Sequence, residues 1–170
     1  FKKVDRDCTL EFLTVEDSVG HKTYDRTVTI ILLKAIYETV GIENIDKIKL
    51  EYSIGNGLYF SKKGNFEVTQ ELVDKVKAKM KEYVDKDLLI IKKSMPIDEA
   101  NQLFEKNKMF DKTKLFRYRG SSTVNVYNLD GYCDYYYGYM LPSIMIFRCT
   151  TMDSCLYCQR RVLQRSLVNS

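Results

Sequence analysis

The sequence has little of the chemistry on which most enzyme sites depend. Its 170 residues contain one histidine, His21, and lack both phosphate-binding patterns, GxxxxGK[ST] and GxGxxG. A zinc site usually needs several converging His or Cys side chains, and phosphate chemistry usually needs a glycine-rich loop. We therefore expect no zinc site built in the usual way, and we interpret His21 as an ordinary exposed side chain.

Long apolar runs are also missing. No stretch approaches the roughly 18–20 apolar residues of a membrane helix, and no secretory signal is visible. The five cysteines are odd in number and irregularly spaced, which does not indicate a disulfide framework. We expect no membrane partner and a cytoplasmic location. Because the chain begins at Phe1 rather than Met, we also expect it to be a fragment.

What is present is typical of one ordinary globular domain plus additional short pieces. Hydrophobic residues make up 45% of the chain, enough for a real core, and the net charge is +4 with both signs mixed. That charge is too small to indicate nucleic-acid binding by itself.

The character of the chain changes after Ser143. All lysines and glycines lie before residue 144, whereas the last 27 residues contain four Arg and three of the five Cys. Permitted codons for residues 146–165 also encode, in another frame, a stretch that resembles the body of the chain. We therefore treat 144–170 as an atypical tail and a possible frameshift product, with a new domain or a linker as alternatives. Its lone Cys155–Cys158 pair indicates neither a zinc ribbon nor a redox site.

The periodicity of the body predicts alternating helices and hairpins. The expected strands are 9–13, 47–54, 58–61 and 88–93, and the expected helices are 26–39, 69–84 and 96–105. Asp25 and Thr69 are suitable helix N-caps, Gly41 a suitable helix stop, and Gly55-Asn-Gly57 a strong hairpin turn. This order predicts an α+β domain with helices packed on an antiparallel sheet.

The segment 117–140 holds seven of the thirteen tyrosines. Cations beside aromatic rings suit single-stranded or looped RNA, through backbone attraction and base stacking. The alternative is that the rings form cross-strand pairs that hold hairpins together. The candidate ligand-binding residues are Arg117, Arg119, Tyr127, Tyr135, Tyr136 and Tyr137, with Lys112, Lys114 and Tyr118 beside them.

Two carboxylates in this region are candidates for acid–base work. Asp130 and Asp134 flank Gly131 to Cys133. A turn-forming Asp-Gly pair explains Asp130 more simply. Cys133 has no histidine with which to form a nucleophilic pair, and we expect it to fill space near the turn.

Several of these segments together resemble a known domain. The segments 25–38 and 49–60, and the helix 68–84 with the following 87–90, are similar to the second additional domain of threonyl-tRNA synthetases, which has the threonyl/alanyl-tRNA synthetase fold. With 117–132 and 137–142 added, the pattern also resembles the same domain in bacterial uridine (nucleoside) kinase-like proteins.

The resemblance implies three parts. Residues 1–20 would be the end of a ubiquitin-like TGS domain, 21–143 the synthetase-like domain, and 144–170 the atypical tail. It also implies a parent protein with an ATP- and Mg²⁺-dependent nucleoside kinase domain, although this chain itself needs no cofactor. The expected partners are RNA or a nucleotide, and that kinase domain.

The departures from the synthetase pattern concern its zinc site. In the synthetases, a helix with the pattern HxxxH and a later Cys/His pair hold zinc and serve hydrolysis of mischarged tRNA. The corresponding positions here are Arg26, Ile30, Tyr136 and Met140. We therefore expect a non-catalytic accessory domain. The alternatives are a tRNA-editing hydrolase that uses Asp130, Asp134 or Tyr136, a synthetase fragment, and a structural spacer.

Overall fold

The computed structural model describes residues 5–54 and 57–148 of the chain. Its helices are α1 (Ser18–Val40), α2 (Gln70–Asp85), α3 (Ile97–Lys106) and α4 (Phe110–Phe116), with short 3-10 helices η1 (Ile42–Asn44) and η2 (Met145–Arg148). Its strands are β1 (Ile45–Ile54), β2 (Gly57–Gly64), β3 (Ile90–Pro96), β4 (Thr123–Leu129) and β5 (Tyr132–Tyr135). The predicted α+β class is confirmed.

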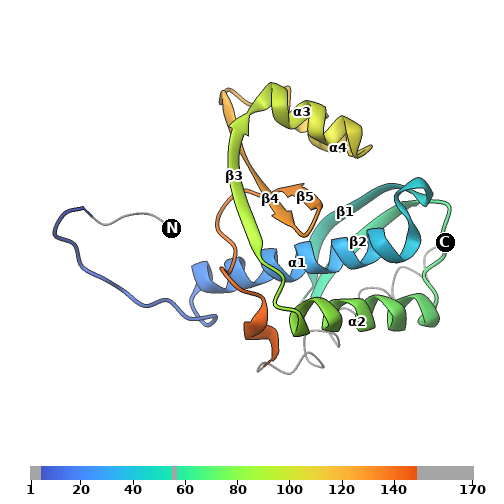
Figure 1. Ribbon diagram of the computed structural model, residues 1–170, viewed down its shortest axis with the longest axis horizontal. Helices are drawn as coiled ribbons and strands as arrows, with labels where there is room; N and C mark the ends of the chain where they lie inside the picture. Colours follow the sequence, from blue (N-terminus) through green and yellow to red (C-terminus); the bar gives the residue numbers. More distant parts are fainter. Residues whose placement is uncertain (1–4, 55–56, 149–170) are drawn as a thin grey trace.

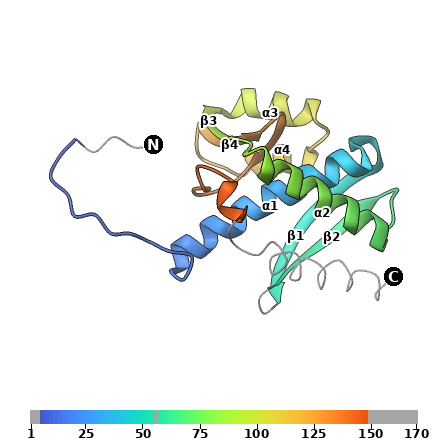
Figure 2. The same ribbon diagram turned by 60° about the horizontal axis from the view of Figure 1, so that its bottom comes forward.

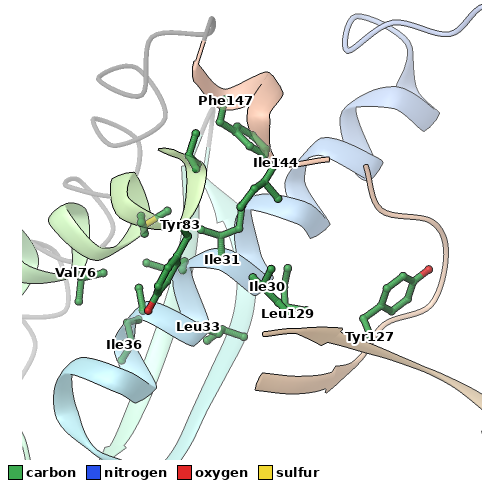
Figure 3. Packing of buried hydrophobic residues seen from close by; sticks show 14 of the residues in the cluster. Ile30, Ile31, Leu33, Ile36, Val76, Tyr83, Tyr127, Leu129, Ile144 and Phe147 are labelled. Atoms are coloured by element: carbon green, nitrogen blue, oxygen red, sulfur yellow. The ribbon is translucent and has the colours of Figure 1, made fainter. Parts of the chain in front are cut away.

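Helix α1 runs through the middle of the molecule, with α2 and the β1–β2 hairpin on one side and the second sheet on the other (Figures 1 and 2). Its middle segment, from Thr29 to Ile36, is buried on all sides. A helix that is apolar all round is typical of a central position. Figure 3 shows Ile31 of α1 and Tyr83 of α2 in the same packed cluster.

The two sheets are antiparallel. The β1–β2 hairpin runs as predicted, from Ile45 paired with Gly64 to Ile54 paired with Gly57, although the turn residues 55–56 lie outside the described residues. The other sheet has the order β3-β4-β5. The β4–β5 turn is Asp130-Gly131, both with positive φ (46° and 86°), which is the geometry of a two-residue hairpin loop.

The two faces of the β3-β4-β5 sheet bury different partners. Tyr127 and Leu129 of β4 face the α1 cluster. Val124 and Val126 alternate with them and pack in a second cluster with α3 and α4. Figure 1 shows α3 and α4 on the side of this sheet away from α1. Alternate residues of β4 therefore face different clusters, and the aromatic residues near this strand lie on one side of the sheet or the other.

Helix α2 begins and ends close to the prediction. The Thr69 hydroxyl accepts a hydrogen bond from the Leu72 backbone N–H at 3.2 Å, which makes Thr69 the N-cap. Val73, Val76 and Met80 are buried. Residues in this pattern give one apolar face toward α1.

The start of the chain differs from the prediction. Residues 9–13 do not form a strand, because no strand among the described residues pairs with them, and Leu10 and Phe12 are exposed. Helix α1 begins at Ser18 rather than Arg26, so Asp25 lies inside it instead of capping it. The chain turns instead at Asp17, whose carboxylate accepts from the Thr14 N–H at 2.6 Å.

The start of the atypical tail is part of the core. Ile144 and Phe147 are buried beside α1 and α2 (Figure 3), and the Phe147 ring packs at a tilt against Tyr24 with ring centroids 5.0 Å apart. The rest of the tail, including Cys155 and Cys158, lies outside the described residues, so its origin stays a prediction. Over the part of the chain that is described, no helix has the length and apolar character needed to cross a membrane.

Candidate functional site

Arg26, on α1, meets the segment that follows β5. Its Nη1 donates to the Tyr139 carbonyl oxygen at 3.3 Å. A Cβ atom added at Gly138 would lie 2.7 Å from Arg26 Cζ, and Gly138 has φ +116°. The guanidinium therefore lies directly against the backbone at a position that only glycine fills without strain.

Two further hydrogen bonds hold this segment in place. The Thr27 hydroxyl accepts from the Leu141 N–H at 3.0 Å, and the Tyr127 hydroxyl donates to the Gly138 carbonyl. A second cation lies nearby, because Lys92 Nζ is 4.8 Å from the centroid of the Tyr139 ring. We call Arg26, Lys92, Gly138 and Tyr139 the Arg26 site.

The four positions that correspond to zinc ligands in the resemblance lie in one region. Ile30 is fully buried, and Tyr136 and Met140 pack against the same core cluster. Their side chains do not suit zinc, since Arg26 is a permanent cation and Ile30 and Met140 offer no imidazole, thiolate or carboxylate. The fourth, Tyr136, keeps its hydroxyl protonated, because burial raises its pKa well above the usual value. Among residues 5–54 and 57–148, no three His, Cys, Asp or Glu side chains gather to hold a metal. The residues therefore do not fit the zinc of the synthetase pattern.

A buried polar cluster lies beside this region. Asp134 is buried and pairs with Lys112, whose Nζ is 2.8 Å from Oδ1. Burial raises the pKa of Asp134, while Lys112 opposes that rise. The Tyr132 hydroxyl donates to Asp134 Oδ2 at 3.4 Å. The hydroxyl of Tyr136 is buried without a well-formed hydrogen bond to the described residues, and burial raises its pKa well above the usual value.

The predicted RNA-binding residues are divided between the core and the surface. Tyr127 is buried, Tyr136 has its hydroxyl buried, and Lys112 is paired with Asp134. That part of the predicted surface is therefore in the core: Tyr127 of β4 and Tyr136 after β5 pack in the α1 cluster, and Lys112 of α4 reaches the buried Asp134 of β5. Arg117 and Tyr137 are exposed.

Arg119 lies between two of the tyrosines. Its guanidinium carbon is 5.1 Å from the Tyr135 ring centroid and 5.7 Å from that of Tyr137. Tyr135 is anchored in turn by an edge-on contact with Phe116 at 5.2 Å. The predicted pairing of cations with aromatic rings is thus present here, as stacked cation–π contacts.

The contacts of Asp130, Cys133 and His21 are typical of residues that support the fold. Asp130 forms the hairpin turn, and its backbone oxygen and carboxylate both face Lys34. Cys133 lies beside the turn, as expected, within 3.0 Å of Asn128 Nδ2. His21 lies on α1, is largely exposed and is 3.5 Å from the Asp25 carboxylate.

Sequence reasoning missed the buried ammonium of Lys34. This side chain is 2% exposed, lies 2.5 Å from Glu38 Oε1, and donates to the Asp130 carbonyl oxygen at 2.9 Å. A cavity of about 210 Å³ lies beside it, lined also by Tyr37 and Met109. The signal was available in principle, since Lys34 interrupts an apolar run and has Glu38 one turn later.

Glu38 connects α1 to α2. The Tyr83 hydroxyl and Lys79 both donate to its Oε2. Partial burial is the largest single influence on Glu38 and raises its pKa. The hydrogen bonds from Lys34, Tyr83 and Lys79 outweigh it and bring the pKa to about 2.

Comparison with known proteins gives one consistent result. No protein-family model matches the chain. It is 30% identical to a threonine–tRNA ligase of Thermotoga neapolitana over 104 residues, 61% of the chain. It is 32% identical to that of Clostridium kluyveri over 101 residues (58% of the chain) and 31% identical to that of Thermotoga maritima over 106 residues (61%).

These matches cover small parts of the relatives. The chain spans 16% of the two Thermotoga ligases and 15% of the Clostridium kluyveri ligase. The α+β chain therefore contains a region similar to threonine–tRNA ligases, which agrees with the synthetase side of the sequence resemblance. These relatives give no support to the nucleoside kinase side, which stays a prediction.

Proposed function

We propose that this domain is a synthetase-derived module that binds the 3′ end of a tRNA at the Arg26 site without hydrolysing the ester there. The proposal rests mainly on Arg26, which occupies a position that the resemblance assigns to a zinc ligand. Its guanidinium is hydrogen-bonded to the Tyr139 carbonyl oxygen. The relatives named above are ligases for which tRNA is a substrate, which supports RNA as the ligand.

The Arg26 site has the groups that an RNA end requires. Arg26 and Lys92 supply positive charge for phosphates, and a guanidinium has donors enough to serve a phosphate oxygen and the Tyr139 carbonyl together. The Tyr139 side chain is 68% exposed and offers a ring on which a terminal base can stack. None of these contacts requires a metal ion.

The hydrolase alternative has weaker support. Asp134 is buried and paired with Lys112, so it is poorly placed to activate water at the surface. Asp130 forms a turn beside Lys34, and the Tyr136 hydroxyl is buried. These surroundings favour structural roles for all three candidates.

The experiment is to measure tRNA binding to the full chain by fluorescence anisotropy. Arg26→Gln is expected to weaken binding of intact tRNA about tenfold, the usual size of a charge-assisted contact. Lys75→Gln on α2 is the control, since it removes one charge from an exposed pair with Glu71. Removal of the terminal nucleotides from the tRNA should reproduce the Arg26→Gln result. Equal binding of intact and shortened tRNA would contradict the proposal.

The wider protein is a separate proposal. The ligase relatives favour a synthetase fragment over an accessory domain of a nucleoside kinase. Sequencing of the gene beyond the codon for Ser143 distinguishes them. An in-frame GxxxxGK[ST] pattern would restore the kinase setting, with ATP and Mg²⁺ as its ligands.

A further inference from the structure

The positive charge of the chain is concentrated in one short segment. Residues 106–119 contain four Lys and two Arg but one acidic residue, Asp111, which makes a net charge of +5. The whole chain carries +4, so the remainder is slightly negative. Of these cations, Lys112 forms an ion pair with Asp134, whereas Lys114 and Arg117 are exposed.

Exposed aromatic rings accompany this charge. Tyr118 is 90% exposed and Tyr137 is 79% exposed. Arg119 contacts the Tyr135 and Tyr137 rings, so one cation restrains the Tyr137 ring although most of its surface faces solvent. Such a restraint reduces the conformational freedom that the ring loses when a base stacks on it.

This surface is distinct from the Arg26 site. Tyr135 packs with Phe116 in the cluster beneath α3 and α4, on the face of the β3-β4-β5 sheet away from α1. Arg26 and Tyr127 belong to the α1 side. The segment from Tyr135 to Tyr139 passes from one side to the other.

We propose that a second surface, the α4 platform, binds the interior of a single-stranded RNA by backbone attraction and base stacking. Its residues are Lys114, Arg117, Tyr118, Arg119 and Tyr137. The proposal extends the proposed function but rests on different residues, so the two can fail separately.

The chemistry selects single-stranded nucleic acid over other polyanions. Lysine and arginine attract any chain of phosphates or carboxylates, but the exposed tyrosine rings add energy only when flat bases are free to stack. Bases in a duplex are already stacked and paired, and an acidic peptide has no base to offer. Stacking on rings of this kind also tolerates any base, so we expect little sequence preference.

The test uses the full chain and a circular, end-free oligouridylate, which presents no terminus to the Arg26 site. Tyr137→Ala is expected to raise the dissociation constant about 5- to 150-fold, the range for losing one stacked base. Lys114→Gln and Arg117→Gln should each lower the slope of log K against log salt by about 0.7, the value for one single-strand phosphate.

Three controls keep the result specific. Lys81→Gln, an exposed lysine on α2, should change affinity by less than about twofold. Lys75→Gln, at an exposed ion pair on α2, should likewise leave binding of the circle unchanged. Circular dichroism and thermal melting should show that every variant is folded.

Three results would overturn the proposal: no binding of the circle, wild-type affinity in folded Tyr137→Ala, or equal binding of a duplex or a polyglutamate peptide. If the circle binds normally but Arg26→Gln has no effect on intact tRNA, the α4 platform stands and the proposed function fails.

Discussion

Arg26 Nη1 lies 3.3 Å from the carbonyl oxygen of Tyr139, which joins the first half of α1 to a backbone segment more than a hundred residues later. The contact brings together two regions that the sequence resemblance assigns to one metal site. In this chain it is a hydrogen bond, and the neighbouring residue Gly138 leaves the room for it.

Gly138→Ala should therefore destabilise the fold by about 1–3 kcal/mol, because the new methyl meets Arg26 and φ +116° is strained for any other residue. Gly120→Ala is the matched control, since its Cβ would meet nothing within 4 Å, and should change stability by less than about 0.5 kcal/mol. Urea denaturation measures both. Equal effects at the two glycines would contradict the close approach.

Lys34→Ala should cost about 2–4 kcal/mol of unfolding free energy. The substitution removes a buried stem and the ammonium that ties Glu38 to Asp130. Lys75→Ala loses a similar pair with Glu71, but at the surface, and should cost less than about 1 kcal/mol. Chemical denaturation measures the unfolding free energy of both variants. A larger loss for Lys75→Ala than for Lys34→Ala would contradict the prediction.

Sequence patterns predicted the elements whose signals are local. Thr69 caps α2 through its own side chain, Asp130-Gly131 turns because both residues accept positive φ, and Gly41 ends α1 with φ 87°. The predicted start of α1, at Arg26, is eight residues too late. Asp25 has a side chain suited to an N-cap, but in the structure it lies inside the helix.

The site was harder to predict, because its geometry depends on contacts between distant segments. The resemblance assigned Arg26 and residues 136 and 140 to one site, and in the structure Arg26 donates to the Tyr139 carbonyl oxygen. The burial of Tyr127 and the pairing of Lys112 with Asp134 depend on which face of β4 and β5 packs on α1 and which on α4. A run of adjacent tyrosines gives no period from which to choose that face. The α4 helix was missed for a similar reason, since its seven residues are too short for a helical period.

Lys112→Met should cost about 3–5 kcal/mol, because it leaves the buried carboxylate of Asp134 without its cation. Adding Asp134→Asn should recover at least about 1 kcal/mol, since a neutral amide still accepts from the Tyr135 N–H. A double-mutant cycle from urea denaturation measures the coupling. Strictly additive effects would mean that the two side chains do not form a buried pair in solution.

Acid should weaken the contact between α1 and α2 through Glu38. The pKa of Glu38 is lowered from 4.5 to about 2 in the folded chain, so its contribution is complete above pH 4.5 and is lost as the pH falls toward 2. Glu38→Gln should flatten the stability curve in this window. Glu71→Gln should change the curve less, because water screens its pair with Lys75. If stability depends on pH in the same way in wild type and Glu38→Gln, Glu38 is not the group that weakens this contact in acid.

The central claim is binding of a tRNA end without hydrolysis, and single-turnover deacylation tests it most directly. A threonine tRNA that carries the wrong amino acid is incubated with an excess of the full chain, with and without added zinc. The protein concentration is one at which fluorescence anisotropy shows that the tRNA is bound. We predict that the ester decays at its spontaneous rate in both cases, and that Arg26→Gln weakens binding without changing that decay. Decay at an enzyme-like rate, abolished by substitution of Asp134 or Tyr136, would contradict the claim.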